Sequence, residues 1–265
     1  ILASGISGAR SFLRRGEAPP QPDPNAPQRV TLLSVPFFHA TGCFAILSPT
    51  IIAGGKIVLM HKWDAVKAFE LIEKEKINTA GGVPTIAWQL IEHPRRGEFD
   101  LSSLESVAYG GAPSAPELVK KIVETFPKSQ PGNGWGMTET NPLGTLSRKV
   151  AKRSHINISE DQQFENIAKA GLAMPGLEIE IFDEEWNRLP HDGEAVGELC
   201  IQGPWIASEY FNDPQPDKFH DGWLVTGDVA KIDPEQYILI ADRSKDLIKS
   251  GGEWISSVDL ENHIV

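Results

Sequence analysis

Apolar and polar positions along this chain change in blocks whose spacing predicts strands and helices in alternation. Asp64 precedes an amphipathic stretch in which Phe69 and Ile72 fall near one face, so we expect it to cap that helix. The expected elements are strands over 31–35, 56–60, 79–83 and 106–109 and helices over 43–52, 64–74, 85–92 and 115–126. Such alternation indicates an α/β fold with a parallel sheet, where ligands gather at the carboxyl ends of the strands.

The pattern changes after about residue 170. Short strands are expected over 177–182, 197–202 and 237–240, which predicts a smaller β-rich subdomain. Between the two parts, residues 148–168 are polar and mixed in charge, and we expect a mobile loop or linker there. Residues 16–28 hold five prolines in thirteen positions, which predicts an exposed loop.

Composition narrows the function classes. The chain has 265 residues and is 40% hydrophobic, so it can bury a sizeable core. It has 25 Lys and Arg against 36 Asp and Glu, a net charge of −11, and it has no basic stripe, which argues against a nucleic-acid partner. Cys43 and Cys200 lie in apolar surroundings and are expected as small buried hydrophobes in a reducing, cytoplasmic setting. No cysteine or histidine spacing predicts a zinc site.

One uncharged stretch is long enough to be weighed as a membrane segment, because residues 32–55 contain no Asp, Glu, Lys or Arg. Pro36, His39 and Pro49 interrupt it, and it runs on into a strand-like segment, so a buried strand, turn and helix fit it better. We therefore expect no transmembrane segment. The sequence leaves open a peripheral membrane association and a homodimer.

Two glycine-rich segments that follow expected strands suggest a nucleotide site. Tyr109–Pro113 (Tyr-Gly-Gly-Ala-Pro) lacks bulky side chains, so a flat ligand can lie against its backbone, although a tight turn explains it equally well. In Asn133–Glu139 (Asn-Gly-Trp-Gly-Met-Thr-Glu), Trp135 is suited to stack on a base whose edge the asparagine can bond, and a core aromatic is the alternative. The hydroxyl of Thr138 and the carboxylate of Glu139 suit a phosphate oxygen and Mg²⁺.

Two later segments are less specific when taken alone. Thr226–Asp228 (Thr-Gly-Asp) ends at a carboxylate suited to ribose hydroxyls, but by itself it is a turn. Residues 242–255 place basic side chains and adjacent glycines around a short apolar step. A solvated charge run that ends in a turn fits that composition, and so does a hinge that brings cations to a phosphate.

Taken together and in order, these segments resemble the motifs of adenylate-forming, AMP-binding enzymes, and residues 249–256 are most similar to fatty acyl-CoA synthetases. The segments that carry the resemblance are 36–39, 109–113, 134–139, 197–203, 226–228 and 242–254. The resemblance implies αβα-type layers of a large adenylation domain, a small β-barrel-like subdomain and only the start of a C-terminal domain. It assigns 1–29 to a helix remnant and Pro-rich loop, 30–170 to the α/β part, 171–241 to the β-rich subdomain and 242–265 to the hinge and the start of the C-terminal domain.

The resemblance implies an acid–thiol ligase that works in two steps. A carboxylate, here a fatty acid, attacks the α-phosphate of ATP to give acyl-AMP and pyrophosphate, and the thiol of coenzyme A then displaces AMP. ATP, the acid and coenzyme A are the implied substrates and Mg²⁺ the implied cofactor, with catalysis by positioning and charge stabilisation. The alternatives are a fatty acyl-AMP ligase that serves a carrier protein, a luciferase-like oxygenase and a non-catalytic nucleotide-binding module.

The resemblance also implies the role of each site residue. Gly111, Ala112 and Trp135 would sandwich adenine. The whole nucleotide site is assigned to Gly110, Gly111, Ala112, Pro113, Asn133, Gly134, Trp135, Gly136, Met137, Thr138, Asp228 and Arg243, with the last two on the ribose. The implied catalytic residues are Thr138 at the α-phosphate, Glu139 at Mg²⁺, His39 beside the acyl pocket and Lys245 at the domain pivot. The acyl and coenzyme A channel is assigned to His39, Gly134, Lys249, Gly251, Gly252 and Trp254.

Two family features have no match in the sequence. The Ser/Thr/Gly-rich phosphate loop that precedes the His39 motif in such enzymes is absent, and the C-terminal lysine that promotes adenylation would lie beyond Val265. We therefore expect a central fragment that binds adenosine nucleotides weakly and turns over little or nothing.

Overall fold

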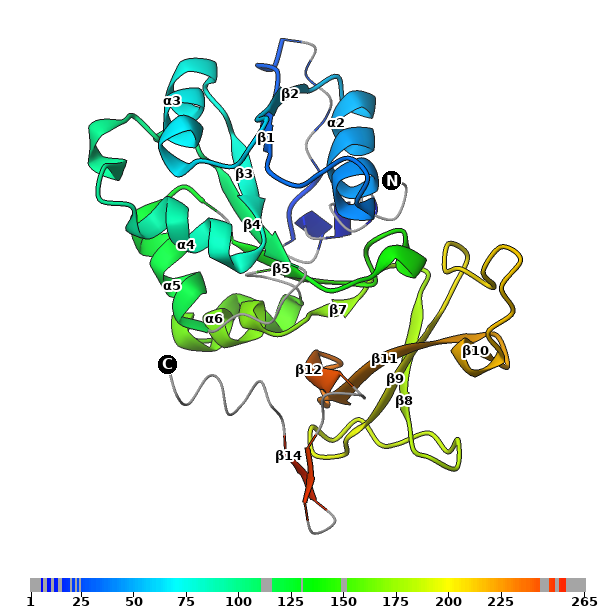
Figure 1. The fold of residues 1–265 in the computed structure, drawn as a ribbon. Coiled ribbons are helices and arrows are strands. Elements are labelled where there is room, and N and C mark those ends of the chain that lie inside the picture. Colours follow the sequence, from blue (N-terminus) through cyan, green and yellow to red (C-terminus); the bar gives the residue numbers. More distant parts are fainter. Residues whose placement is uncertain are drawn as a thin grey trace.

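The computed structural model describes two main sheets, of which the larger is covered by helices (Figure 1). The described residues are 6, 9–10, 12–13, 16–19, 21, 23, 25–110, 116–129, 131–148, 152–243, 248–250 and 253–255. The strands of the larger sheet are β1 (Val30–Leu33), β2 (Lys56–Leu59), β3 (Thr79–Gly82), β4 (Ser106–Gly110), β5 (Gly132–Gly134), β6 (Thr145–Arg148) and β7 (Leu172–Ala173).

The larger sheet confirms the predicted parallel α/β fold. Its seven strands lie in the order β2-β1-β3-β4-β5-β6-β7, and the pairs among the first five are parallel. The last two strands join antiparallel. The carboxyl ends of the five parallel strands therefore meet at one edge, where open α/β sheets bind ligands.

Helices fold back between the strands, as the alternation predicted. The longer ones are η1 (Thr41–Leu47, a π-helix), α2 (Ser48–Ile52), α3 (Ala65–Glu75), α4 (Pro84–Glu92), α5 (Pro116–Thr125) and α6 (Glu160–Ala168). The short 3₁₀ turns are η2 (Arg96–Glu98), η3 (Thr138–Thr140), η4 (Arg153–Asn157) and η5 (Pro216–Lys218). The single apolar helix expected over 43–52 is thus a π-helix followed by a short α-helix.

α3 shows how the pattern produces the packing. The Asp64 carboxylate accepts a hydrogen bond from the Lys67 backbone N–H at 2.8 Å, so the predicted cap is confirmed. Phe69 and Ile72 are fully buried and belong to the core cluster of the larger sheet. Burial of side chains of this size contributes about 1.5–3 kcal/mol each. Lys76 adopts a left-handed conformation and ends the helix.

The prediction of a mobile loop over 148–168 was wrong for the described part of that segment. η4 and α6 lie there, and α6 is capped by Ser159, whose hydroxyl accepts from the Gln162 N–H. Phe164 and Ile167 are buried in the core of the larger sheet. The helix has few apolar residues among many polar ones, so its local composition resembles a loop although its narrow apolar face packs against α5.

The smaller sheet is antiparallel and follows the larger one in the chain. Its strands are β8 (Glu178–Phe182), β9 (Gly197–Gln202), β10 (Phe219–His220), β11 (Trp223–Ile232) and β12 (Ile238–Arg243). Thr226–Asp228 lies inside β11 instead of forming a free turn, beside the register shift between Val225 and Val229. Cys200 on β9 is fully buried, which raises the pKa of its thiol to about 12, whereas Cys43 is partly buried. β13 (Ile248–Ser250) and β14 (Glu253–Ile255) form a separate hairpin.

Backbone and side-chain contacts join the two sheets at the start of β12. The Ile238 N–H donates to the Gly171 carbonyl at 3.0 Å, and the Ala170 N–H donates to the Ile238 carbonyl at 3.0 Å. Beside this bridge, buried His155 stacks on Tyr237, with ring centroids 5.7 Å apart and His155 Nδ1 3.3 Å from the tyrosine hydroxyl. These contacts fix the end of β12 from which the chain runs to Arg243.

Because the His155 imidazole is buried, we expect the folded protein to lose stability in acid. Burial, followed by the charge of Lys152, lowers the pKa of His155 below 6.5; Glu235 opposes this shift and Lys169 adds to it. Because the pKa is lower in the folded protein, the contribution of His155 to the free energy of unfolding is complete above pH 6.5 and is lost as the pH falls through the folded-state pKa. One such group changes the free energy of unfolding by at most about 1.4 kcal/mol per pH unit. Urea unfolding from pH 7.5 to pH 5, taken as about the usable range, should show this slope. His155→Phe should remove it and the exposed-site control His61→Gln should keep it; equal slopes in all three proteins would refute the prediction.

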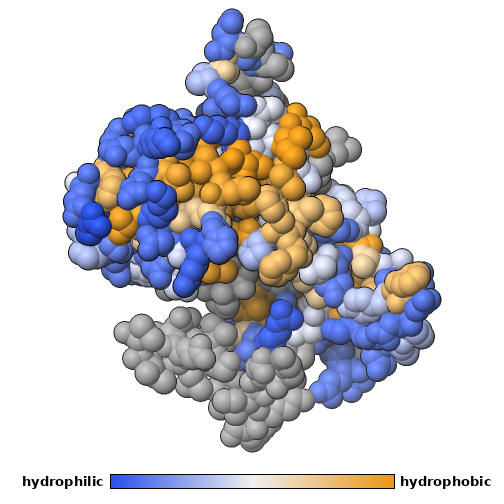
Figure 2. All heavy atoms as spheres, turned by 45° about the horizontal axis from the view of Figure 1, so that its top comes forward, coloured by the Kyte–Doolittle hydropathy of each residue, from blue (hydrophilic) through white to orange (hydrophobic). Residues whose placement is uncertain are grey.

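Large apolar side chains gather on one face of the molecule (Figure 2). The exposed ones around β1, β2, η1 and α2 include Phe37, Phe38, Phe44, Ile51, Ile52 and Leu59. Contiguous exposed apolar surface is typical of a surface that contacts another surface or a ligand. Among the described residues, every helix is too short or too polar to cross a lipid bilayer.

Candidate functional site

The candidate site lies where β4 and β5 end at the carboxyl edge of the larger sheet. Gly110 and Gly134, the last residues of these strands, are partners in the parallel register. A Cβ atom at Gly110 would lie 2.7 Å from the Gly134 carbonyl oxygen, so the close approach of the two strands requires glycine. Trp135 to Glu139 follow Gly134 directly, which places the central motif at this edge.

Three predicted site residues from distant parts of the chain meet in one hydrogen-bonded group. The indole N–H of Trp135 donates to Asp228 Oδ2 at 2.8 Å, and Arg243 Nε lies 2.9 Å from Asp228 Oδ1. Asp228 and Arg243 are cross-strand partners on β11 and β12, whereas Trp135 directly follows β5 of the larger sheet. The structure therefore brings the predicted adenine and ribose residues together across the junction of the two sheets.

The Asp228 carboxylate is held in a desolvated position. It is 4% exposed, and this burial raises its pKa, while the Trp135 hydrogen bond and the charges of Arg243 and Lys218 oppose the shift. The preceding residue in β11 is fixed as well, because the Gly227 N–H donates to Glu198 Oε1 at 2.7 Å and Gly227 has a left-handed φ of +78° at the register shift. Glu198 belongs to the 197–203 segment, whose contribution to the site no local pattern shows.

The Trp135 ring packs closely against the chain that follows it. A Cβ atom at Gly144 would lie 2.6 Å from the ring carbon Cζ3, so this residue must be glycine for the indole to keep its place. At Gly136 a Cβ atom would lie 1.8 Å from the Pro142 carbonyl oxygen. The turn is closed by Thr140, whose hydroxyl accepts from the Met137 N–H at 2.9 Å. The segment that carries Met137, Thr138 and Glu139 is thus held by the close approach of Gly136 to the Pro142 backbone and by the Thr140 hydroxyl.

Glu139 has a partner that the sequence analysis missed. The Tyr210 hydroxyl donates to Glu139 Oε1 at 2.5 Å, and this hydrogen bond, with burial second, raises the pKa of Tyr210 to about 12. The Glu139 carbonyl also accepts from the Ala207 N–H at 2.9 Å. Thr138 beside it is exposed. No spacing or motif around Tyr210 signals this contact, since the two residues lie 71 positions apart.

Asn133 and His39 lie at the same sheet edge but do not belong to the hydrogen-bonded group of Trp135, Asp228 and Arg243, here called the Trp135 group. The buried Asn133 amide donates from Nδ2 to the carbonyls of Ala168 and Lys169 at 3.0 and 3.1 Å, which ties β5 to the end of α6. His39 is exposed in the loop after β1, and its Nδ1 lies 3.4 Å from the Thr41 N–H. Both positions follow from the parallel order of the strands.

The other predicted site residues belong to the segments around residues 111–113 and 245–254. Gly111, Ala112, Pro113, Lys245, Gly251 and Gly252 lie outside the described residues. Lys249 and Trp254 are register partners across the β13–β14 hairpin, of which the backbone is described.

In the described part of the chain, no three His, Cys, Asp or Glu side chains are grouped so that they could hold a metal ion.

Comparison with known proteins identifies the family. A model of the AMP-binding enzyme family matches residues 8–211, more than half of the chain. The chain therefore belongs to the AMP-binding enzymes.

Individual relatives are acyl-CoA ligases, in agreement with the resemblance found in the sequence. The chain is 41% identical over 192 residues to 3-methylmercaptopropionyl-CoA ligase from Ruegeria lacuscaerulensis, a match that covers 72% of this chain and 35% of the relative. It is 35% identical over 241 residues to medium-chain-fatty-acid–CoA ligase from Ectopseudomonas oleovorans, covering 90% of this chain and 43% of the relative. The chain thus spans less than half the length of these relatives.

A solved structure shows the same fold. O-succinylbenzoate coenzyme A synthetase from Bacillus subtilis, in complex with ATP and magnesium ion, superposes with a TM-score of 0.76 at 25% identity. The match covers 99% of this chain and 49% of that structure. The arrangement of both sheets in this chain is therefore that of an adenylate-forming enzyme.

Proposed function

We propose that this chain is the nucleotide-binding part of an AMP-forming acyl-CoA ligase. The complete enzyme would join a carboxylic acid, with a medium- or long-chain fatty acid as the first choice, to AMP with release of pyrophosphate. It would then transfer the acyl group to the thiol of coenzyme A with release of AMP. The observation that carries the proposal is the contact of Trp135 with the Asp228–Arg243 pair across the two sheets.

In this proposal the Trp135 group receives adenosine. The indole presents a flat apolar surface for adenine, and the buried Asp228 carboxylate is the acceptor for ribose hydroxyls, with Arg243 beside it. Asn133 uses both amide hydrogens on the carbonyls of Ala168 and Lys169 at the end of α6, so its Oδ1 is left to accept from the exocyclic amine of adenine. This last contact would favour adenine over guanine.

The residues after Trp135 would handle the phosphates. The exposed Thr138 hydroxyl would donate to the α-phosphate, and Glu139 fits a magnesium ion because Tyr210 occupies one carboxylate oxygen and orients the other. Mg²⁺ is commonly held by one or two carboxylates together with substrate phosphates, so a cluster of protein carboxylates is not required. When bound, the ion would neutralise phosphate charge as the adenylate forms.

The remaining assignments rest on the family alone. We propose that His39 borders the acyl pocket, that Gly134 and Gly136 leave room for the acyl carbonyl, and that Lys245 marks the pivot of a C-terminal domain. Lys249, Gly251, Gly252 and Trp254 are proposed for the coenzyme A channel. The division into 1–29, 30–170, 171–241 and 242–265 is part of the same proposal, as are a cytoplasmic location, a peripheral membrane contact and a homodimer.

Hydroxylamine trapping of the complete protein tests the proposed reaction. With ATP, Mg²⁺ and a fatty acid, the proposal predicts an acyl hydroxamate without coenzyme A and a thioester with AMP release once coenzyme A is added. Hydroxamate without any thioester would indicate transfer to another acceptor and refute the ligase assignment. Absence of both products for every acid in an acyl-chain series would refute the enzymatic function.

Tyr210→Phe tests the orientation of Glu139. The change removes one hydroxyl that holds the carboxylate but leaves the carboxylate itself, so its effect on Mg²⁺ is indirect and affinity for Mg·ATP should fall about 3–10-fold, or about 0.7–1.4 kcal/mol. Affinity for metal-free AMP should stay unchanged. Titration calorimetry of both ligands measures the difference, with Phe211→Leu, at a neighbouring exposed ring, as the control. An equal loss for AMP and Mg·ATP would contradict the assigned role.

A further inference from the structure

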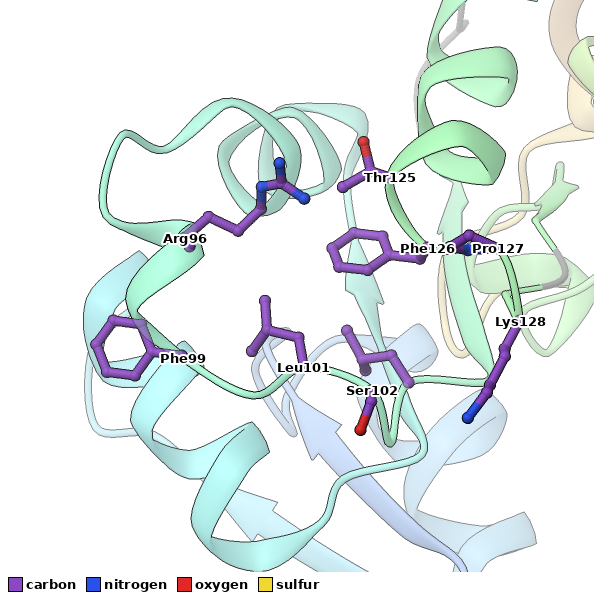
Figure 3. Close-up of a pocket in the computed structure, with 10 residues that line it drawn as sticks. Arg96, Phe99, Leu101, Ser102, Thr125, Phe126, Pro127 and Lys128 are labelled. Atoms are coloured by element: carbon purple, nitrogen blue, oxygen red, sulfur yellow. The ribbon is translucent and has the colours of Figure 1, made fainter.

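A pocket lies between η2 and the end of α5, away from the candidate nucleotide site (Figure 3). Its volume is about 380 Å³, within the size range of small-molecule sites. Residues that line it include Arg96, Phe99, Leu101, Leu104, Thr125, Phe126 and Lys128. The segments that form it lead into β4 and β5 at their amino ends. The nucleotide motifs follow the carboxyl ends of the same strands, so the two sites lie on opposite edges of the sheet.

The interior of the pocket is apolar. Leu104 is 2% and Phe126 is 6% exposed, and Leu101 lies beside them. In Figure 3 the side chains of Leu101 and Phe126 point into the space between the two segments. Such a floor favours a hydrocarbon or aromatic group, because transfer of apolar surface from water into it is favourable.

The mouth of the pocket carries positive charge that the described residues do not neutralise. Within that part of the chain, the Arg96 guanidinium has no hydrogen bond or ion pair, and Figure 3 shows it beside Thr125 and above Phe126. Lys128 also lines the pocket, but Figure 3 shows it on the other side, with its side chain directed away from Arg96.

The two carboxylates that follow Arg96 most closely in the chain are already engaged. Glu98 is paired with Arg95 at 2.7 Å and Asp100 with Lys76 at 3.0 Å. Arg95 and Arg96 are adjacent, but only Arg96 lines the pocket.

From this arrangement we infer that the pocket binds a small amphipathic anion, with its apolar part on Leu101, Leu104 and Phe126 and its anionic group on the Arg96 guanidinium. A guanidinium binds a carboxylate through two parallel N–H donors, which fixes the anionic end and leaves the apolar end to the floor. The site differs from the proposed catalytic centre in position and residues, so its ligand does not have to be a substrate. A medium-chain carboxylate has the required chemistry.

Methyl NMR with octanoate as the probe tests the inference directly. In the chain labelled at leucine methyl groups, we expect saturable shifts of Leu101 and Leu104 on addition of octanoate. Arg96→Gln should weaken the affinity at least about tenfold because it removes the charge-assisted contact, while the matched control Arg95→Gln should leave it unchanged. 1-Octanol, which has the chain but no charge, should bind at least about tenfold more weakly than octanoate.

Asp228→Asn separates this site from the nucleotide site, since it should leave the Leu101 and Leu104 response intact. The response therefore does not depend on the proposed ligase function. The inference fails if the two leucines do not shift, if octanol matches octanoate, or if Arg96→Gln and Arg95→Gln bind octanoate equally.

Discussion

Asp228→Ala should lower the affinity of the chain for AMP about 100-fold or more. The carboxylate is the proposed acceptor for two ribose hydroxyls, and hydrogen bonds to a charged group contribute about 1.5–3 kcal/mol each, so loss of two exceeds about 3 kcal/mol. The alanine would also leave the partly buried Trp135 N–H without its acceptor. Titration calorimetry with AMP measures the loss, and Asp161→Asn, at an exposed position on α6, is the charge control.

Asp228→Asn distinguishes a binding role from a structural one. Burial raises the folded-state pKa of Asp228 above the ordinary value of 3.8. Stability from such a group is complete below the unfolded pKa and is lost as the pH rises through the folded one, so the ionised carboxylate is unfavourable to folding at pH 7. The asparagine keeps an acceptor for Trp135 without that charge. We expect AMP affinity to fall while the melting temperature stays level or rises; a lowered melting temperature with AMP affinity retained would show that Asp228 is structural.

Gly136→Ala should destabilise the chain by about 2–4 kcal/mol. The new Cβ atom would lie 1.8 Å from the Pro142 carbonyl oxygen, and a backbone atom cannot move aside as a flexible side chain can. The turn that carries Thr138 and Glu139 would have to shift, so nucleotide affinity should fall as well. Urea unfolding measures the change in free energy.

Gly132→Ala on β5 is the matched control for this substitution. Its nearest new contact is the Ser147 carbonyl oxygen at 3.5 Å, an ordinary van der Waals distance. We expect it to cost less than about 1 kcal/mol. If Gly136→Ala and Gly132→Ala had equal free energies of unfolding, that result would contradict the close packing of the turn against Pro142.

The sequence predicted the elements whose periodicity and caps agree. α3 is an example, because its apolar spacing, the Asp64 cap and the packing of Phe69 all indicate the same helix. α6 was missed because few of its residues are apolar and the segment around it is polar. Its apolar face can be recognised only from its packing against α5 in the folded chain. β11 was missed for a related reason, since Gly227 and Asp228 look like a turn although they lie in a strand.

The candidate site shows more clearly that sequence patterns do not reveal contacts formed by tertiary structure. The motifs could indicate that Trp135 and Asp228 belong to one nucleotide site, but not that they bond each other, because 93 positions separate them and only the junction of the sheets brings them together. Tyr210 had no local signal at all, and the 197–203 segment gave no sign that Glu198 holds Gly227, since each residue acts by holding a residue from another part of the chain. Residues that bind a ligand are visible in motifs, whereas the residues that position them depend on tertiary structure.

The most direct test of the account is titration calorimetry of this chain with AMP, with GMP and adenosine as comparisons. If Trp135, Asn133 and Asp228 form an adenosine site, AMP should bind at one saturable site with a Kd below about 1 mM, adenosine should compete for it, and GMP should bind at least about tenfold more weakly. No saturable binding of AMP, or equal binding of AMP and GMP, would contradict the adenosine site on which the proposed function rests.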